Sequence, residues 1–99
     1  MTIKYSEDAI LDIEQAVLWY QNIRKELSTE LEHNLDNGIE SICRKPDSFQ
    51  KKYKNIRIYF IRKFPYGIHY LVIDEEILVL GVFHTSRNPT SWFPRITNT

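Results

Sequence analysis

The residues best suited to acid–base chemistry follow an almost continuously apolar stretch of the sequence. His84 comes directly after the run Ile77–Phe83, and Arg87 lies three residues further on, in a polar segment. Catalytic groups are often found on such loops because a rigid strand fixes their geometry. A histidine transfers protons near neutral pH, and an arginine stabilises the charge that grows on a phosphate attacked by a ribose 2′-OH. Arg57, Arg62 and Lys63 belong to a strand one hairpin away in sequence, so that these cations could converge with Arg87 on one rim. In that arrangement His84, Arg87 and Arg62 are candidate catalytic residues of a ribonuclease.

A structural role is the alternative for the same residues. Most charged side chains are solvated or paired. Arg57 and Arg62 would then pair with acidic side chains of the helical region, and His84 would cap the end of its strand. The spacing of these residues leaves both interpretations open.

The charges of this electrically neutral chain are distributed unevenly along it. Residues 1–43 carry nine acidic and three basic side chains, whereas residues 44–63 carry eight basic side chains and one acidic side chain. A basic stretch in one part of a small domain indicates an anionic partner, either nucleic acid or an acidic protein segment. A solvated loop and strand rich in lysine is the alternative. Arg57, Arg62 and Lys63 would form the basic face.

Several classes of function are excluded by the sequence. No residue set has the spacing of a known metal site, phosphate-binding loop or nucleophile elbow, so we expect no metal and no cofactor. The only cysteine, Cys43, cannot form an internal disulfide. No apolar run approaches the roughly 18 residues that span a bilayer. Residues 1–8 also lack the features of a signal peptide. We expect one cytoplasmic domain over residues 1–99, without a membrane partner.

Two helices are predicted in the N-terminal half, after a short strand over residues 3–5. Ser6 is a suitable N-cap, and apolar residues recur at spacings of four and three from Ala9 to Leu27. Thr29 and Glu32 match a capping box, which predicts a second helix that begins there and ends before Pro46. So short a connection indicates an antiparallel hairpin. Trp19 lies slightly off the apolar stripe, at the expected edge of the core. Gly38 is either a point of close backbone approach or a tolerated weak position.

Strands are predicted after a polar loop over residues 46–54. Residues 55–64 and 68–73 are separated by the turn Pro65-Tyr66-Gly67, and a turn at residues 74–76 precedes the last strand, residues 77–84. Tight turns between consecutive strands make an antiparallel meander. The helical hairpin must bury its apolar stripe on this sheet. The prediction is a two-layer α+β domain in the order β-α-α-β-β-β.

Several residues of the C-terminal half together form a specific pattern. They are Arg57, the run Arg62-Lys63-Phe64-Pro65-Tyr66, Tyr70 and, after the apolar strand, His84-x-x-Arg87-x-Pro89-x-x-Trp92. This pattern resembles RelE/ParE-type toxins of bacterial toxin–antitoxin pairs. The resemblance implies a protein that halts growth when free and is silenced by a cognate antitoxin, which typically lays an extended or helical segment along the toxin. It also implies a target-binding face made of Arg57, Arg62, Lys63, Arg87 and Trp92.

Two activities occur in this superfamily. RelE-like members cut mRNA within the ribosome without a metal, whereas ParE-like members poison DNA gyrase and hydrolyse nothing themselves. The ribosome-directed ribonucleases are usually strongly basic, whereas this chain is neutral. Many of them also carry a catalytic tyrosine near the C-terminus, whereas no tyrosine follows Tyr70 in this sequence. The long helical hairpin also favours the ParE-like branch, in which the protein is not an enzyme. His84 supports the ribonuclease alternative, and a domain that has lost activity and only binds an antitoxin is the third.

Overall fold

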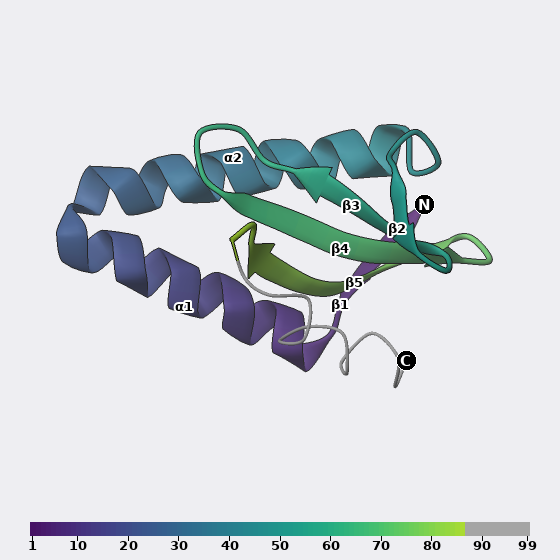
Figure 1. Ribbon diagram of the computed structural model, residues 1–99, viewed down its shortest axis with the longest axis horizontal. Coiled ribbons are helices and arrows are strands. Elements are labelled where there is room, and N and C mark those ends of the chain that lie inside the picture. Colours follow the sequence, from purple (N-terminus) through teal and green to yellow (C-terminus); the bar gives the residue numbers. More distant parts are fainter. Residues whose placement is uncertain (87–99) are drawn as a thin grey trace.

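The computed structural model describes residues 1–86 and has two layers, with a pair of helices on one face of a five-stranded sheet (Figure 1). The elements are β1 (Thr2–Tyr5), α1 (Glu7–Ile23), α2 (Lys25–Arg44), β2 (Lys51–Tyr53), β3 (Ile56–Phe60), β4 (Tyr66–Ile73) and β5 (Glu76–His84). The α+β architecture predicted from the sequence is confirmed. No helix in this part of the chain is both long and apolar enough to span a membrane.

The start of α1 is fixed by its predicted N-cap. The Ala9 N–H donates to Ser6 Oγ at 3.0 Å, and the Ser6 hydroxyl donates to the Leu80 carbonyl oxygen of β5 at 3.1 Å. The Ser6 N–H also donates to the Val79 carbonyl oxygen at 3.0 Å. One residue therefore caps the helix and attaches it to the sheet.

The second helix begins earlier than the sequence predicted. Only Arg24 interrupts the helices, with an extended backbone at φ −165° and ψ 131°, and α2 runs from Lys25 without a break through Ser28. The capping box at Thr29 and Glu32 was therefore wrong. The buried Ser28 hydroxyl donates to the Lys25 carbonyl oxygen at 2.7 Å, so this residue belongs to the helix interior. A cap contributes only about 1 kcal/mol, and tertiary packing overrides it. The predicted end before Pro46 is confirmed.

The sheet has the strand order β1-β5-β4-β3-β2. The predicted antiparallel meander of β3, β4 and β5 is confirmed. The sheet as a whole is mixed, because β1 pairs in parallel with β5. Part of the predicted 46–54 loop is the edge strand β2, which pairs with β3 through Lys51↔Arg57 and Tyr53↔Ile56. Two lysines in a three-residue strand give no apolar alternation to detect, although lysine is well suited to a sheet edge.

The turn between β3 and β4 lies earlier than predicted. Tyr66 and Gly67 already belong to β4, and the chain reverses over residues 61–65. Lys63 adopts the left-handed conformation at φ 69°, and the Ile61 N–H donates to the Tyr66 carbonyl oxygen at 3.1 Å. The side chains of Arg62 and Lys63 therefore belong to an exposed turn rather than to the face of a strand.

The main core lies between the helices and one face of the sheet. Its most buried members are Ala9, Leu31, Ile42, Ile68, Tyr70, Ile77 and Val79. Gly38 of α2 is a point of close approach, since an added Cβ would lie 2.9 Å from Tyr59 Cε1. Ile10 and Ile23 belong to the apolar stripe that the sequence predicted to be buried, but they are 47% and 60% exposed on the outer face of α1.

Tyr70 attaches the segment after α2 to the sheet, and its hydroxyl gives a test of the fold. It donates to the Pro46 carbonyl oxygen at 2.6 Å, and burial raises the pKa of the phenol to about 12, partly offset by Arg57. Tyr70→Phe should lower the free energy of unfolding by about 0.5–1.5 kcal/mol at neutral pH. Because the folded pKa is raised, this difference should be constant below about pH 10 and shrink as the pH rises toward 12. Urea denaturation of both proteins between pH 7 and 11.5 measures it. A difference that grows with pH would contradict the assignment.

Candidate functional site

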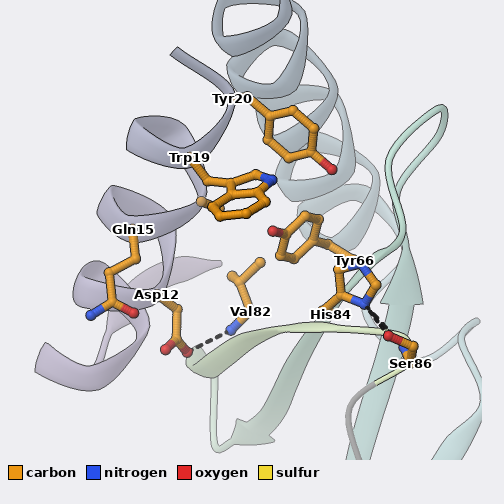
Figure 2. A pocket seen from close by; sticks show the side chains of 9 residues that line it. Asp12, Gln15, Trp19, Tyr20, Tyr66, Val82, His84 and Ser86 are labelled. Atoms are coloured by element: carbon orange, nitrogen blue, oxygen red, sulfur yellow. Dashed lines mark hydrogen bonds between the residues drawn. The ribbon is translucent and has the colours of Figure 1, made fainter. Parts of the chain in front are cut away.

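A concave pocket of about 460 Å³ lies between α1 and the adjoining ends of β4 and β5 (Figure 2). Nine residues line it: Asp12, Gln15, Ala16, Trp19, Tyr20, Tyr66, Val82, His84 and Ser86. Figure 2 shows the α1 residues on one side and the strand residues on the other. We call it the α1–β5 pocket. His84, which the sequence analysis identified as a candidate catalytic residue, lines this pocket.

The helical wall is held against the strand by Asp12. Its Oδ2 accepts a hydrogen bond from the Val82 N–H at 3.0 Å, so the carboxylate lies over β5. Trp19 lies seven residues further along α1 and is 65% exposed, although the sequence placed it at the core edge. Asp12, Gln15, Ala16 and Trp19 recur at spacings that share a helix face. This spacing was a signal for the pocket that the sequence analysis missed.

The strand wall holds His84 in one orientation. His84 of β5 is the cross-strand partner of Tyr66 of β4, and the two rings lie edge to face with their centroids 5.3 Å apart. The Ser86 N–H donates to His84 Nδ1 at 3.1 Å, and the Ser86 hydroxyl lies 2.7 Å from the same nitrogen. This contact requires the tautomer in which Nδ1 accepts and the ring hydrogen is on Nε2.

Arg57 has a structural role in the loop after α2. Its side chain is only 17% exposed, and its guanidinium donates to the Phe49 carbonyl oxygen at 2.6 Å. The same group lies 3.8 Å from Asp47 Oδ1. The sequence offered a structural pairing as one interpretation of Arg57, with a partner in the helical region. The partners found here belong instead to the loop that follows the helices.

Arg62 and Lys63 are exposed on the β3–β4 turn but do not join His84. Lys63 Nζ lies 3.5 Å from Glu30 Oε2 of α2. Arg62 lines a separate, polar pocket of about 240 Å³ together with Asn34, Asn37, Glu40, Ser41, Arg44 and Tyr59. The proposed catalytic pair of His84 and Arg62 is therefore not found in one pocket. Arg87 and Trp92 lie outside the described residues.

The described lining of the α1–β5 pocket holds one carboxylate. Asp12 is an acidic lining residue, and no lysine or arginine is found among the lining residues that the structure describes. Aromatic rings and hydroxyl groups provide most of the remaining surface, from Trp19, Tyr20 and Tyr66. The described lining thus has aromatic rings and neutral hydrogen-bond donors, but no lysine or arginine to pair with a phosphate.

Comparison with known proteins identifies a family from the sequence and a similar fold among solved structures. The family model described as the ParE toxin of the type II toxin–antitoxin system parDE matches residues 3–89. The fold is similar to a solved structure of the chromosomal ParDE system from P. aeruginosa, with a TM-score of 0.77 and 13% sequence identity. This similarity covers 87% of the present chain and 97% of the other. No match is found among curated proteins.

Two arginines of this region should differ in their effect on stability. Arg57→Ala removes a hydrogen bond between a charged group and a carbonyl oxygen, and should lower the free energy of unfolding by about 1–3 kcal/mol. The matched control is Arg62→Ala, which removes an exposed side chain and should change this free energy by less than about 0.5 kcal/mol. Urea denaturation followed by circular dichroism measures both. Equal effects of the two substitutions would contradict the structural role of Arg57.

Proposed function

Because the chain belongs to the ParE family, the toxins of type II toxin–antitoxin systems, we propose that it arrests growth by poisoning DNA gyrase in the cytoplasm. A cognate antitoxin neutralises it by binding. The protein acts as a binder of its target and not as an enzyme. The family match over residues 3–89 supports this branch of the superfamily.

The composition of the α1–β5 pocket is the observation that carries the choice between the two activities. A metal-independent ribonuclease needs cations beside its proton carrier, because negative charge develops on the phosphate during attack. The described lining around His84 offers the Asp12 carboxylate and no lysine or arginine. This arrangement favours binding over RNA cleavage.

The surface that contacts the target includes the β3–β4 turn. The side chains of Arg62 and Lys63 are exposed on this turn. Arg87 and Trp92 complete this surface in our proposal, on the basis of the sequence alone. Arg57 is left out of it because its guanidinium is engaged by the loop at residues 47–49. Exposed charges of this kind steer association with an oppositely charged partner.

RNA cleavage remains the second candidate because of the geometry of one histidine. The His84 ring is held by Ser86 through Nδ1, which leaves Nε2 as the nitrogen that can reach a substrate. The Tyr20 and Tyr66 hydroxyls line the same pocket and add further proton carriers. A protein that only binds an antitoxin is the remaining alternative, and a growth assay separates it from both.

Expression of the chain alone should arrest growth, and co-expression of the small protein encoded beside it should restore growth. On the gyrase proposal, DNA breaks should accumulate and plasmid supercoiling should change, while mRNA remains intact. All of these are followed in one culture after induction. Normal growth with abundant folded protein would leave the antitoxin-binding alternative, and mRNA cleavage without DNA breaks would support the ribonuclease.

A matched pair of double variants tests the surface in the same assay. Arg62→Ala with Lys63→Ala should weaken the arrest. Lys51→Ala with Lys52→Ala removes the same charge from β2 and should leave the arrest unchanged. An equal loss in both would show that net charge matters and the turn does not.

His84→Gln separates the two activities at one residue. Glutamine keeps similar bulk and hydrogen-bonding capacity, but it does not titrate. Loss of a positioned acid or base typically lowers a rate by about 10²–10⁴-fold. We expect the variant to arrest growth, with intact mRNA and with DNA breaks. Loss of arrest together with loss of an mRNA cleavage seen in the wild type would make His84 catalytic.

A further inference from the structure

One arginine among residues 1–86 differs from the others in having no acidic partner. This part of the chain contains four arginines, and three of them form ion pairs: Arg24 with Glu26 at 3.8 Å, Arg44 with Glu40 at 3.9 Å and Arg57 with Asp47 at 3.8 Å. Within the same residues, neither an ion pair nor a hydrogen bond is found for the side chain of Arg62, which is exposed. A guanidinium has five N–H donors and is always charged, so Arg62 is available to an anion.

Arg62 lines the polar pocket of about 240 Å³ between α2 and the end of β3, which we call the α2–β3 pocket. Four of its α2 residues recur at spacings of three and four and therefore share one helix face: Asn34, Asn37, Ser41 and Arg44. On the sheet side, Tyr59 lies against Gly38, where an added Cβ would be 2.9 Å from the Tyr59 Cε1. The Tyr59 ring also meets the Phe49 ring edge to face, with the centroids 4.9 Å apart. Packing therefore holds this wall of the pocket in place.

The lining of the α2–β3 pocket carries a net positive charge. Its charged residues are Glu40, Arg44 and Arg62. Glu40 pairs with Arg44 on the same helix at 3.9 Å, so the charge that remains is that of Arg62. The side-chain amide of Asn37 and the hydroxyl of Tyr59 add neutral hydrogen-bond donors to the lining. This set of groups is suited to an anion with a single charge.

The acidity of α2 favours a carboxylate as the ligand over a nucleic-acid backbone. The helix carries five acidic side chains, against one lysine and one arginine. A nucleic-acid strand has a negative charge at every phosphate, so it would bring several charges to a largely acidic helix. A side-chain carboxylate brings one charge to one guanidinium. The two groups also match in shape, because both are planar and together form two parallel hydrogen bonds.

We propose that the α2–β3 pocket binds a glutamate or aspartate side chain of the protein target, with both carboxylate oxygens paired with the guanidinium of Arg62. The volume of about 240 Å³ accommodates one such side chain. The target-binding surface thereby extends from the β3–β4 turn onto α2, and Asn37 and Tyr59 become contact residues. The identity of the occupant rests on the proposed function, whereas the preference of the pocket for a carboxylate does not.

The pocket is tested first with a small probe on the full chain. Acetyl-glutamate methylamide is titrated against the ¹⁵N-labelled protein at constant pH and ionic strength, and acetyl-glutamine methylamide serves as the neutral probe of nearly the same shape. The side-chain Nε–H signal of Arg62 and the backbone amide signal of Ser41 should shift saturably with the glutamate probe and hardly at all with the glutamine probe. A short single-stranded DNA should not displace the glutamate probe. Displacement by the DNA would identify a nucleic acid as the ligand and overturn the proposal.

Substitutions of both charge signs separate the pocket from the general charge of the domain. Arg62→Gln, followed through Ser41, should weaken binding of the glutamate probe by about tenfold. Lys63→Gln removes the same charge one residue away, outside the pocket lining, and should change binding by less than about twofold. Glu40→Gln removes the carboxylate of the pocket itself and should strengthen binding by about threefold, whereas Glu32→Gln, elsewhere on α2, should have little effect. Equal binding of the two probes, equal effects of the Arg62 and Lys63 changes, weaker binding after Glu40→Gln, or the absence of saturable shifts would each overturn the proposal.

The occupant is tested with DNA gyrase and the full chain. In calorimetry, Arg62→Gln should lower the affinity for gyrase about tenfold, Glu40→Gln should raise it about threefold, and Glu32→Gln should leave it unchanged. Full affinity of the Arg62 variant would overturn the target as the source of the carboxylate. A wild-type chain that does not bind gyrase would instead refute the proposed function, and leave the probe measurements unaffected.

Discussion

Three elements of the fold depend on hydrogen bonds made by Ser6. Its side chain caps α1 and donates to Leu80, while its backbone N–H donates to Val79. The end of β1, the start of α1 and the middle of β5 are thereby held together. Because α1 leaves the sheet at this fixed point, Asp12 comes to lie over Val82 and the next turns of the helix approach the end of β5. The α1–β5 pocket follows from this one attachment.

Local signals in the sequence predicted the parts of the fold that local forces determine. The cap at Ser6, the helix end before Pro46 and the meander of β3 to β5 all belong to this group. The parallel pairing of β1 with β5 and the short strand β2 depend on partners distant in sequence or on an edge position, so no local pattern indicates them. The sequence predicted the break between the helices too late, because the apolar period continues through Arg24 and a plausible capping box follows at Thr29 and Glu32.

The candidate site was predicted in part. His84 was identified because it ends a strand, and the structure places it in the pocket that α1 closes. The arginines expected beside His84 lie elsewhere. Arg57 donates a hydrogen bond to the loop after α2, and Arg62 lines a pocket with polar residues of α2. Contact between side chains depends on which face of each strand or turn they occupy. Arg62 belongs to the turn between β3 and β4 and not to a strand, so the expected strand face does not carry it toward His84.

The pairing of β1 with β5 has a consequence for the synthesis of the protein. Ser6 and Leu80 are 74 residues apart, so β1 cannot pair with β5 until the residues between them have been synthesised. Closing so long a segment slows folding, and it cannot begin while β5 is still inside the ribosome. Until then the apolar side of the helical hairpin lacks most of the surface that buries it. The nascent chain therefore completes its sheet only after β5 has left the ribosome, and a message truncated before β5 encodes a chain in which β1 cannot form this pairing.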